Sequence, residues 1–299
     1  MVLSNIITVK NLRFGYPKNE VLKGIDLTLH DNELVCLLGV NGAGKSTLLK
    51  CILGILKHQS GNISYGDLAQ QINAGDENTS SKSVSSEDLD PMQMARYMSY
   101  VPQSVKSSFS IDVYDTIMLG RRPYIGWSIS DMDREIVSKT IEFLNLEDFA
   151  FRKFNQLSGG ERQRVIIGKA IAQSPRVFVL DEPTSDLDLK NQIQVMKKLK
   201  ILVSDEKSPK AALVAIHDIN MAARFADRIL LMSDGEIIAG GTPRDVLTPE
   251  NIQKVFGVTA DVIESQEDNR FWIHVKDEIG GELEDEHVFW EHQNIENEG

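Results

Sequence analysis

The stretch GVNGAGKST at residues 39–47 decides the fold of this chain. It fits the pattern G-x-x-x-x-G-K-[ST], and its flanks have the character that this pattern requires. The mainly apolar run at residues 33–38 predicts a buried strand, and residues 47–53 predict the start of a helix. Glycines at a strand-to-helix turn let backbone N–H groups point inward, and the helix N-terminus adds partial positive charge. The stretch therefore predicts an α/β fold with a cradle for phosphate groups.

Two side chains of this stretch bring specific chemistry. Lys45 supplies a mobile cation for the β- and γ-phosphates, and the Ser46 hydroxyl is a hard oxygen ligand for Mg²⁺. The residues expected to surround the phosphates are Gly39, Val40, Asn41, Gly42, Ala43, Gly44, Lys45, Ser46 and Thr47. A glycine turn without a ligand is the alternative, and the strand and helix on either side argue against it.

The composition is that of a globular protein. The chain has 299 residues, of which 41% are hydrophobic and 25% charged, enough for one large domain or two modest ones. No run of eighteen apolar residues occurs, and the N-terminus lacks the pattern of a signal peptide, so we expect a cytosolic location. The two cysteines, Cys36 and Cys51, lie in apolar segments, which predicts reduced, buried thiols.

The net charge of −12 is concentrated in two segments. Residues 67–90 hold six acids and one base, residues 261–299 hold thirteen acids and two bases, and the remainder has a net charge of +4. The acidity therefore belongs to two appendages and argues against nucleic acid as an obligatory partner. Within the first appendage, residues 73–90 have almost no apolar side chain, which predicts a flexible surface insertion.

Two isolated side chains carry little information by themselves. Residues 6–29 alternate as two strands joined by a turn at Tyr16, whose ring can pack in the core or stack on a purine base. Residues 98–103 predict a strand that ends at Gln103, and a single glutamine there is usually ordinary polar surface.

A helical segment follows. The apolar period is helical from residue 113 to residue 151, which predicts a helical insertion between strands. It ends at LSGGERQ, residues 157–163, where Ser158 can cap the next helix. The Ser-Gly-Gly sequence at that helix start can also bind an anion.

Residues 177–182, VFVLDE, place two carboxylates after four apolar residues. Such a run suits a buried parallel strand, and ligands of open α/β sheets bind at the carboxyl ends of the strands. Asp181 is then expected to hold the Mg²⁺ shell and Glu182 to polarise a water molecule. The alternative, a simple helix cap, is weaker because of the phosphate cradle upstream.

A second apolar run, residues 211–216, ends at His217. A lone histidine is usually structural, but one at this edge can bond the γ-phosphate or hold the attacking water. Residues 229–232 and 236–239 are separated by Ser-Asp-Gly, which predicts a hairpin at the edge of the sheet.

Taken together, these motifs resemble the nucleotide-binding subunit of an ATP-binding cassette (ABC) transporter. GVNGAGKST, Gln103, LSGGERQ, VFVLDEP, SDLD and His217 occur in the order of that family, over about residues 5–255. The resemblance implies a phosphate-loop NTPase (RecA-like) core with an antiparallel β subdomain and a helical subdomain at about residues 104–160. It implies a nucleotide-binding domain over residues 1–256 and an acidic extension over residues 257–299.

The resemblance also implies roles for ATP and Mg²⁺. Tyr16 would stack on adenine, Ser46 and Gln103 would touch Mg²⁺, and Asp181 would hold it through water. Glu182 would be the general base and His217 the switch residue. Ser158, Gly159 and Gly160 would cap the γ-phosphate of the ATP held by a second subunit, packed head to tail, so that hydrolysis requires a dimer.

The partners follow from the same resemblance. The helical subdomain would bind polytopic permease subunits at the cytoplasmic face of the membrane, and a separate substrate-binding protein would deliver the cargo. Residues 111–124 resemble importers of iron–siderophore, haem and cobalamin complexes. In the C-terminal extension we expect a strand pair, with Trp272 and Trp290 as local packing anchors.

Two other readings stay open. The first is a cassette ATPase without a transport role, such as an iron–sulfur assembly factor or a translation factor. Translation-type relatives usually carry two cassettes and DNA-repair relatives carry long coiled coils, and neither feature is present. The second is a nucleotide-binding scaffold without activity, against which Glu182 argues.

Overall fold

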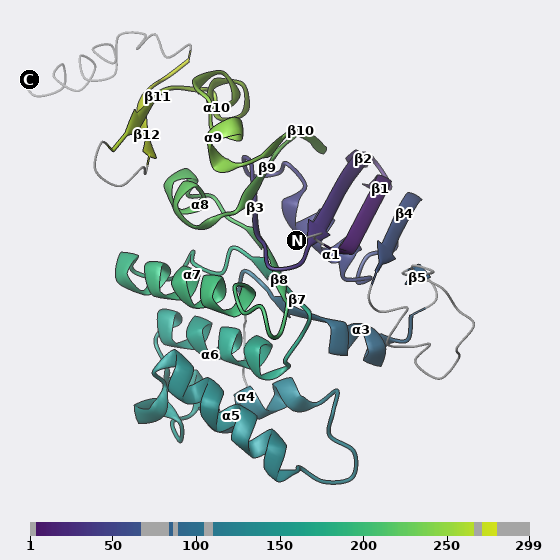
Figure 1. Ribbon diagram of the computed structural model, residues 1–299, viewed down its shortest axis with the longest axis vertical. Helices are drawn as coiled ribbons and strands as arrows, with labels where there is room; N and C mark the ends of the chain where they lie inside the picture. The colour runs from purple at the N-terminus through teal and green to yellow at the C-terminus, as the bar shows by residue number, and fades with distance from the viewer. Residues whose placement is uncertain (1–3, 67–83, 86–88, 105–109, 266–270, 280–299) are drawn as a thin grey trace, which may run out of the picture.

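Six strands form the central sheet of the computed structural model, which describes residues 4–66, 84–85, 89–104, 110–265 and 271–279 (Figure 1). In spatial order they are β10 (Glu236–Gly241), β9 (Arg228–Ser233), β3 (Leu34–Leu38), β8 (Ala211–Ala215), β7 (Val177–Asp181) and β6 (Met98–Val101). The five from β9 to β6 are parallel, and β10 returns antiparallel along β9. The predicted hairpin at the sheet edge is confirmed.

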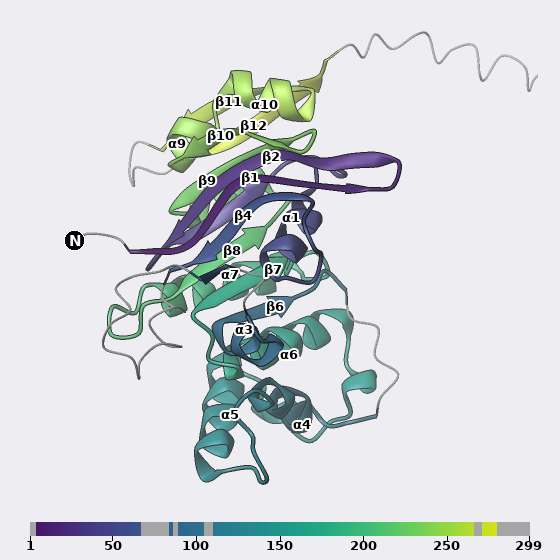
Figure 2. The same cartoon turned by 90° about the vertical axis from the view of Figure 1, so that its right-hand side faces the viewer.

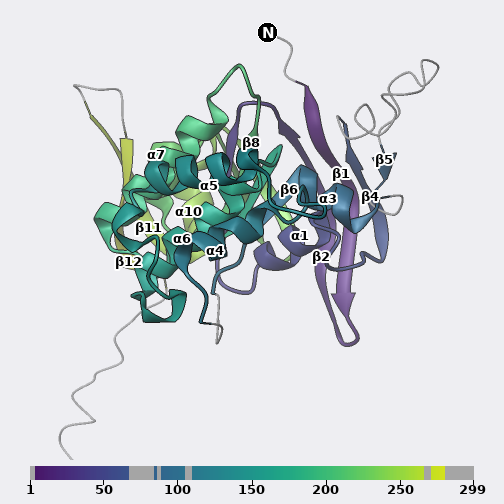
Figure 3. The same ribbon diagram turned by 90° about the horizontal axis from the view of Figure 1, so that it is seen from below.

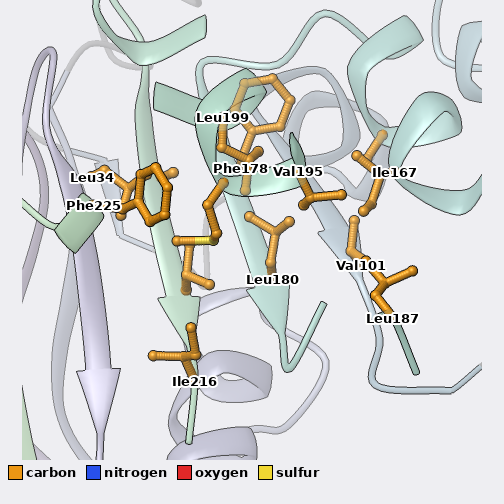
Figure 4. Close-up of a cluster of buried hydrophobic side chains, with 14 of the residues drawn as sticks. Leu34, Val101, Ile167, Phe178, Leu180, Leu187, Val195, Leu199, Ile216 and Phe225 are labelled. Atoms are coloured by element: carbon orange, nitrogen blue, oxygen red, sulfur yellow. The ribbon is translucent and has the colours of Figure 1, made fainter. Parts of the chain in front are cut away.

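The central strands are buried on both faces, which explains their unbroken apolar runs. Along β3, Leu34, Cys36 and Leu38 join one hydrophobic cluster, while Val35 and Leu37 join the other. Phe178 and Leu180 of β7 lie in the first cluster, which Figure 4 shows between the strands and the neighbouring helices. Both cysteines are free and buried, as predicted, and burial raises the pKa of Cys36 to about 12 and that of Cys51 to about 11.

Helices and a second sheet cover the two faces. The first cluster packs under α6 (Gly159–Ala172), α7 (Leu189–Val203) and α8 (Ile219–Phe225). On the other face, α1 (Lys45–Ile52) lies between the central sheet and a four-stranded antiparallel sheet. That sheet consists of β2 (Asn19–His30), β1 (Asn5–Tyr16), β4 (Ser60–Tyr65) and β5 (Val84–Ser85). The expected antiparallel β subdomain is therefore present (Figure 2).

The acidic insertion expected at residues 73–90 lies mostly outside the described residues. Its described part pairs β5 with β4 and ends at Asp90, which precedes α3 (Pro91–Tyr97). Asp90 and Gln93 form a capping box there, and Pro91 suits the first helical turn.

The predicted helical segment forms one end of the molecule, at the bottom of Figures 1 and 2 and nearest the viewer in Figure 3. It begins with α4 (Val113–Met118), continues through α5 (Asp131–Leu144) and ends with α6. Three short 3₁₀ turns interrupt it: η2 (Leu119–Arg121), η3 (Glu147–Phe149) and η4 (Phe154–Gln156). Residues 105–109, which join Gln103 to this segment, lie outside the described residues.

After β10, the chain passes through α9 (Pro243–Val246) and α10 (Pro249–Phe256). It then forms a two-stranded hairpin of β11 (Val258–Glu264) and β12 (Phe271–Glu278). This hairpin lies where a strand pair was predicted for the C-terminal extension. The domain boundary expected at residue 256 stays a prediction. Trp272, expected to be a packing anchor, is exposed on β12 with 45% of its surface accessible, and Trp290 lies outside the described residues. Over the described part of the chain, no helix combines the length and apolarity needed to cross a membrane.

Candidate active site

Four parallel strands bring the predicted residues to one edge of the sheet. The chain leaves β3 at the phosphate loop, β7 at Glu182, β8 just before His217 and β6 two residues before Gln103. A cavity of about 360 Å³ opens at this edge. Its lining consists of Val21, Asn41, Gly42, Gly44, Lys45, Ser46, Thr47, Gln103, Glu182 and His217.

The loop before α1 has the geometry of an anion cradle. Gly42 and Gly44 adopt φ values of 82° and 101°, which residues other than glycine rarely adopt. A Cβ at Gly39 would lie 2.2 Å from the Met232 carbonyl oxygen, so this position has no room for any side chain. Nζ of Lys45 donates to the Gly39 carbonyl at 2.8 Å and to the Val40 carbonyl at 3.0 Å. The backbone and the lysine therefore fold into one compact loop at the helix N-terminus.

Ser46 and Asp181 form a pair of hard oxygen ligands. The Ser46 hydroxyl donates to Oδ1 of Asp181 at 2.9 Å, and the Tyr100 hydroxyl lies 3.4 Å from Oδ2. Burial raises the pKa of Asp181, and the nearby charge of Glu182 raises it further. A bound cation would offset both effects, so these residues fit Mg²⁺. The described residues hold no cluster of three or more His, Cys, Asp or Glu that could bind a metal by themselves.

Glu182 is held on both carboxylate oxygens. Nε2 of Gln103 donates to Oε2 at 2.6 Å, and Nε2 of His217 lies 2.5 Å from Oε1. The Glu182 backbone has a φ of 49°, uncommon for a residue other than glycine, and its N–H donates to the Ala215 carbonyl at 3.0 Å. Such an enforced conformation is typical of functional positions. The three side chains that come from β6, β7 and β8 are thus brought together, as the sequence predicted.

Comparison with known proteins agrees with this geometry. The sequence profile described as "ABC transporter" matches residues 22–185, which include the phosphate loop, Gln103, Asp181 and Glu182. The chain belongs to the ABC transporter family. As an ABC cassette it is an ATP-binding domain and an ATPase.

Individual relatives extend over most of the chain. An uncharacterized ABC transporter ATP-binding protein of Methanocaldococcus jannaschii is 43% identical over 256 residues, 85% of this chain and 92% of the relative. A hemin import ATP-binding protein of Bordetella avium is 36% identical over 81% of this chain and 88% of the relative. A solved inward-facing transporter described as metal-chelate type superposes with a TM-score of 0.74 at 28% identity, covering 92% of this chain and 98% of the solved chain.

Tyr16 and the LSGGERQ segment of this ABC cassette lie outside the cavity. Tyr16 ends β1 with 51% of its surface exposed, and its ring packs edge-on against Phe14 at 5.1 Å. Ser158 caps α6 in a capping box with Glu161, whose N–H donates to the serine hydroxyl at 3.3 Å. Ser158 and Gly159 are exposed, and a Cβ at Gly159 would meet no atom within 4 Å. Their predicted contacts with nucleotide stay predictions.

Sequence reasoning missed two residues of the ABC site. Val21 of β2 lines the cavity, and Tyr100 of β6 bonds to Asp181. The signal for Tyr100 was its position one residue before the strand end, among residues that lead to Gln103. No sequence signal pointed to Val21, because only the folded structure brings the start of β2 against the phosphate loop.

Proposed function

We propose that this chain is the ATP-hydrolysing subunit of an importer for a metal chelate of the iron–siderophore, haem or cobalamin type. The observation that carries the catalytic part is the carboxylate of Glu182, fixed from two sides by Gln103 and His217 within the cavity that Lys45 also lines. The similarity to a hemin import protein and to a metal-chelate type transporter supports the import part.

The reaction assigned to this site is hydrolysis of the terminal phosphoanhydride. Glu182 accepts a proton from water as the water oxygen bonds to the γ-phosphorus, and the bond from phosphorus to the ADP oxygen breaks. Lys45 and the N–H groups of the phosphate loop balance the negative charge of the phosphates. In this proposal, His217 keeps the Glu182 carboxylate oriented, which its contact with Oε1 supports, and bonds a phosphate oxygen when nucleotide is bound.

Ser46, Asp181 and Gln103 would hold Mg²⁺ with the nucleotide. The ion supplies charge neutralisation at the β- and γ-phosphate oxygens when it is bound. The Ser46–Asp181 hydrogen bond keeps these two oxygen ligands side by side, and Gln103 lies next to Glu182 in the same cavity.

A dimer completes the proposed site. Ser158, Gly159 and Gly160 are absent from the lining of their own cavity, yet Ser158 and Gly159 are exposed at a helix N-terminus suited to an anion. In the proposed dimer, this segment caps the γ-phosphate bound by the partner. Gln103 precedes in the sequence the helical segment that would bind the permease, and in this proposal the nucleotide state and the permease contact are coupled at the cytoplasmic face. A separate substrate-binding protein would bring the chelate to that permease.

Glu182→Gln tests the catalytic proposal. We expect ATP binding to persist and phosphate release to fall at least about 100-fold, because the general base is lost while the shape of the side chain is kept. ATP should then trap the dimer, which analytical ultracentrifugation would detect. Glu236→Gln, an exposed carboxylate on β10, is the matched control and should behave as wild type. Undiminished phosphate release by Glu182→Gln would remove this residue from its role.

The import proposal needs a different measurement. The chain, copurified with a candidate permease and reconstituted in vesicles, should hydrolyse ATP faster when an iron chelate, haem or cobalamin is supplied with its binding protein. Failure to associate with any polytopic partner in mild detergent would instead favour a cassette ATPase without a transport role.

A further inference from the structure

Asn220 of α8 makes two hydrogen bonds to the C-terminal hairpin. Nδ2 of Asn220 donates to the Ile273 carbonyl at 3.1 Å, and the Ile273 N–H donates to Oδ1 of Asn220 at 2.7 Å. The amide thus satisfies both backbone groups of Ile273, as a neighbouring strand would. Ile273 and Ala260, on facing strands of the hairpin, are buried in the same hydrophobic cluster as the α8 residues. The hairpin is therefore part of the cassette core and not a loose appendage.

Packing around this contact is incomplete. A cavity of about 630 Å³ lies between α8, α9 and β12, and its lining includes Asn220, Phe271 and Trp272. Apolar contacts therefore cover only part of the interface, and the pair of hydrogen bonds fixes the register of β12 on α8.

Helix α8, which Asn220 anchors, begins shortly after His217. On the N-terminal side of His217, the Ile216 N–H donates to the Leu37 carbonyl at 3.2 Å, which holds the chain against β3. On its C-terminal side, Asp218 caps α8 by accepting from the Met221 N–H at 2.9 Å. The His217 side chain is 42% exposed, so packing does little to hold it, and its place beside Glu182 depends on the backbone at both ends.

We infer that Asn220 is a positioning residue for His217, and that the C-terminal hairpin sets the rate of ATP turnover through it. The inference rests on the proposed role of His217 at Glu182. Asn220 anchors the first turn of α8 to β12, and the N-cap of that helix, Asp218, directly follows the histidine. Freeing this turn lets the imidazole move relative to the carboxylate, and displacements of about 1 Å reduce catalysis strongly.

Asn220→Ala in the full chain is the test. We expect the turnover number for ATP to fall about tenfold, since the geometry at Glu182 is loosened. Affinity for nucleotide should stay within about twofold of wild type, because Asn220 does not line the phosphate cavity. Lys276→Ala is the matched control: it removes the exposed Lys276–Asp261 ion pair of the same hairpin and should leave turnover unchanged.

A second variant identifies the partner of the amide. Ile273→Pro removes the N–H that donates to Asn220, together with a buried isoleucine side chain. It should lower turnover at least as far as Asn220→Ala, and the double variant should lose less than the two single losses added together, because both variants break the same contact. Asn220→Asp, which keeps only the bond accepted from Ile273, should restore part of the turnover.

The outcomes separate cleanly. Wild-type turnover in Asn220→Ala, a loss confined to nucleotide affinity, or additive losses in the double variant would each overturn the inference. If Asn220→Ala melts at a lower temperature, Asn220→Asp decides: turnover above that of Asn220→Ala supports positioning, and turnover as low as that of Asn220→Ala would count against it. Failure of the proposed function appears elsewhere, as undiminished turnover in Glu182→Gln, whatever Asn220 does.

Discussion

Lys45 shows how a single residue is prepared for its ligand. The side chain is 5% exposed, and burial lowers its pKa, while the carboxylates of Glu182 and Asp181 act in the opposite direction. Its ammonium group bonds to two carbonyl oxygens of its own loop. A buried cation that bonds only to neutral carbonyls gains much from an added phosphate charge.

Lys45→Ala should weaken ATP binding by about 10- to 100-fold, the equivalent of one charge-assisted hydrogen bond of 1.5–3 kcal/mol. Titration with a fluorescent ATP analogue would measure this loss. Lys10→Ala, an exposed cation on β1 that does not line the cavity, controls for the overall loss of positive charge. Equal affinities for the two variants would contradict the cradle.

Four residues that line this cavity could be placed together from the sequence because each follows a strand end. Lys45, Gln103, Glu182 and His217 come together once their strands are parallel neighbours, and the runs before them predict that. Asn220 differs, because its partners are the backbone groups of Ile273, 53 residues away. Every residue except proline has the same backbone donor and acceptor, so the residue type at position 273 does not indicate this contact.

Among the elements, the helical segment depends on a buried ion pair. Nε of Arg121 donates to Oδ1 of Asp133 at 2.9 Å, and Nη1 of Arg121 donates to the Ala172 carbonyl at 2.8 Å. The pair therefore joins η2, α5 and the end of α6. Asp133 also belongs to the capping box of α5, where hydrogen bonds from Ser130, followed by those from Arg121, hold its pKa below the usual range.

Asp133→Ala should destabilise this segment by roughly 3 kcal/mol, because it leaves the Arg121 charge buried without its partner. The difference from wild type should be full above about pH 5, where the carboxylate is ionised in both states, and should shrink below about pH 4, as acid protonates it. Urea unfolding followed by circular dichroism between pH 3 and pH 7 measures both effects. Glu135→Ala removes an exposed ion pair on the same helix and should change little.

Element types were easier to predict than element limits. The central strands were found because residues buried on both faces form unbroken apolar runs. The helical period from residue 113 to residue 151, by contrast, gave no sign that α4 ends at Met118. Beyond that point, η2 and a turn bring Arg121 onto Asp133 and onto α6, so a tertiary contact and not local periodicity sets the limit.

At the scale of the whole molecule, the two parts of the proposed site do not meet within one chain. Lys45 and Glu182 line one cavity, whereas Ser158 and Gly159 are exposed elsewhere on the same chain. Phosphoryl transfer depends on charges placed around the γ-phosphate, so under the proposed function the separated Ser158 turn acts on nucleotide held by another copy. A head-to-tail pair of chains satisfies that condition twice by symmetry.

Mixing two inactive variants tests this arrangement. Lys45→Ala lacks a working cradle but keeps its Ser158 segment, whereas Ser158→Arg keeps its cradle and blocks the segment that it lends. In a mixed dimer, the cradle of the second variant faces the intact Ser158 segment of the first, so one of the two sites is complete. Random pairing makes about a quarter of all sites complete, and phosphate release should rise toward that share of the wild-type rate on mixing. If Ser158 served the ATP of its own chain, every site would keep one defect and mixing would restore nothing.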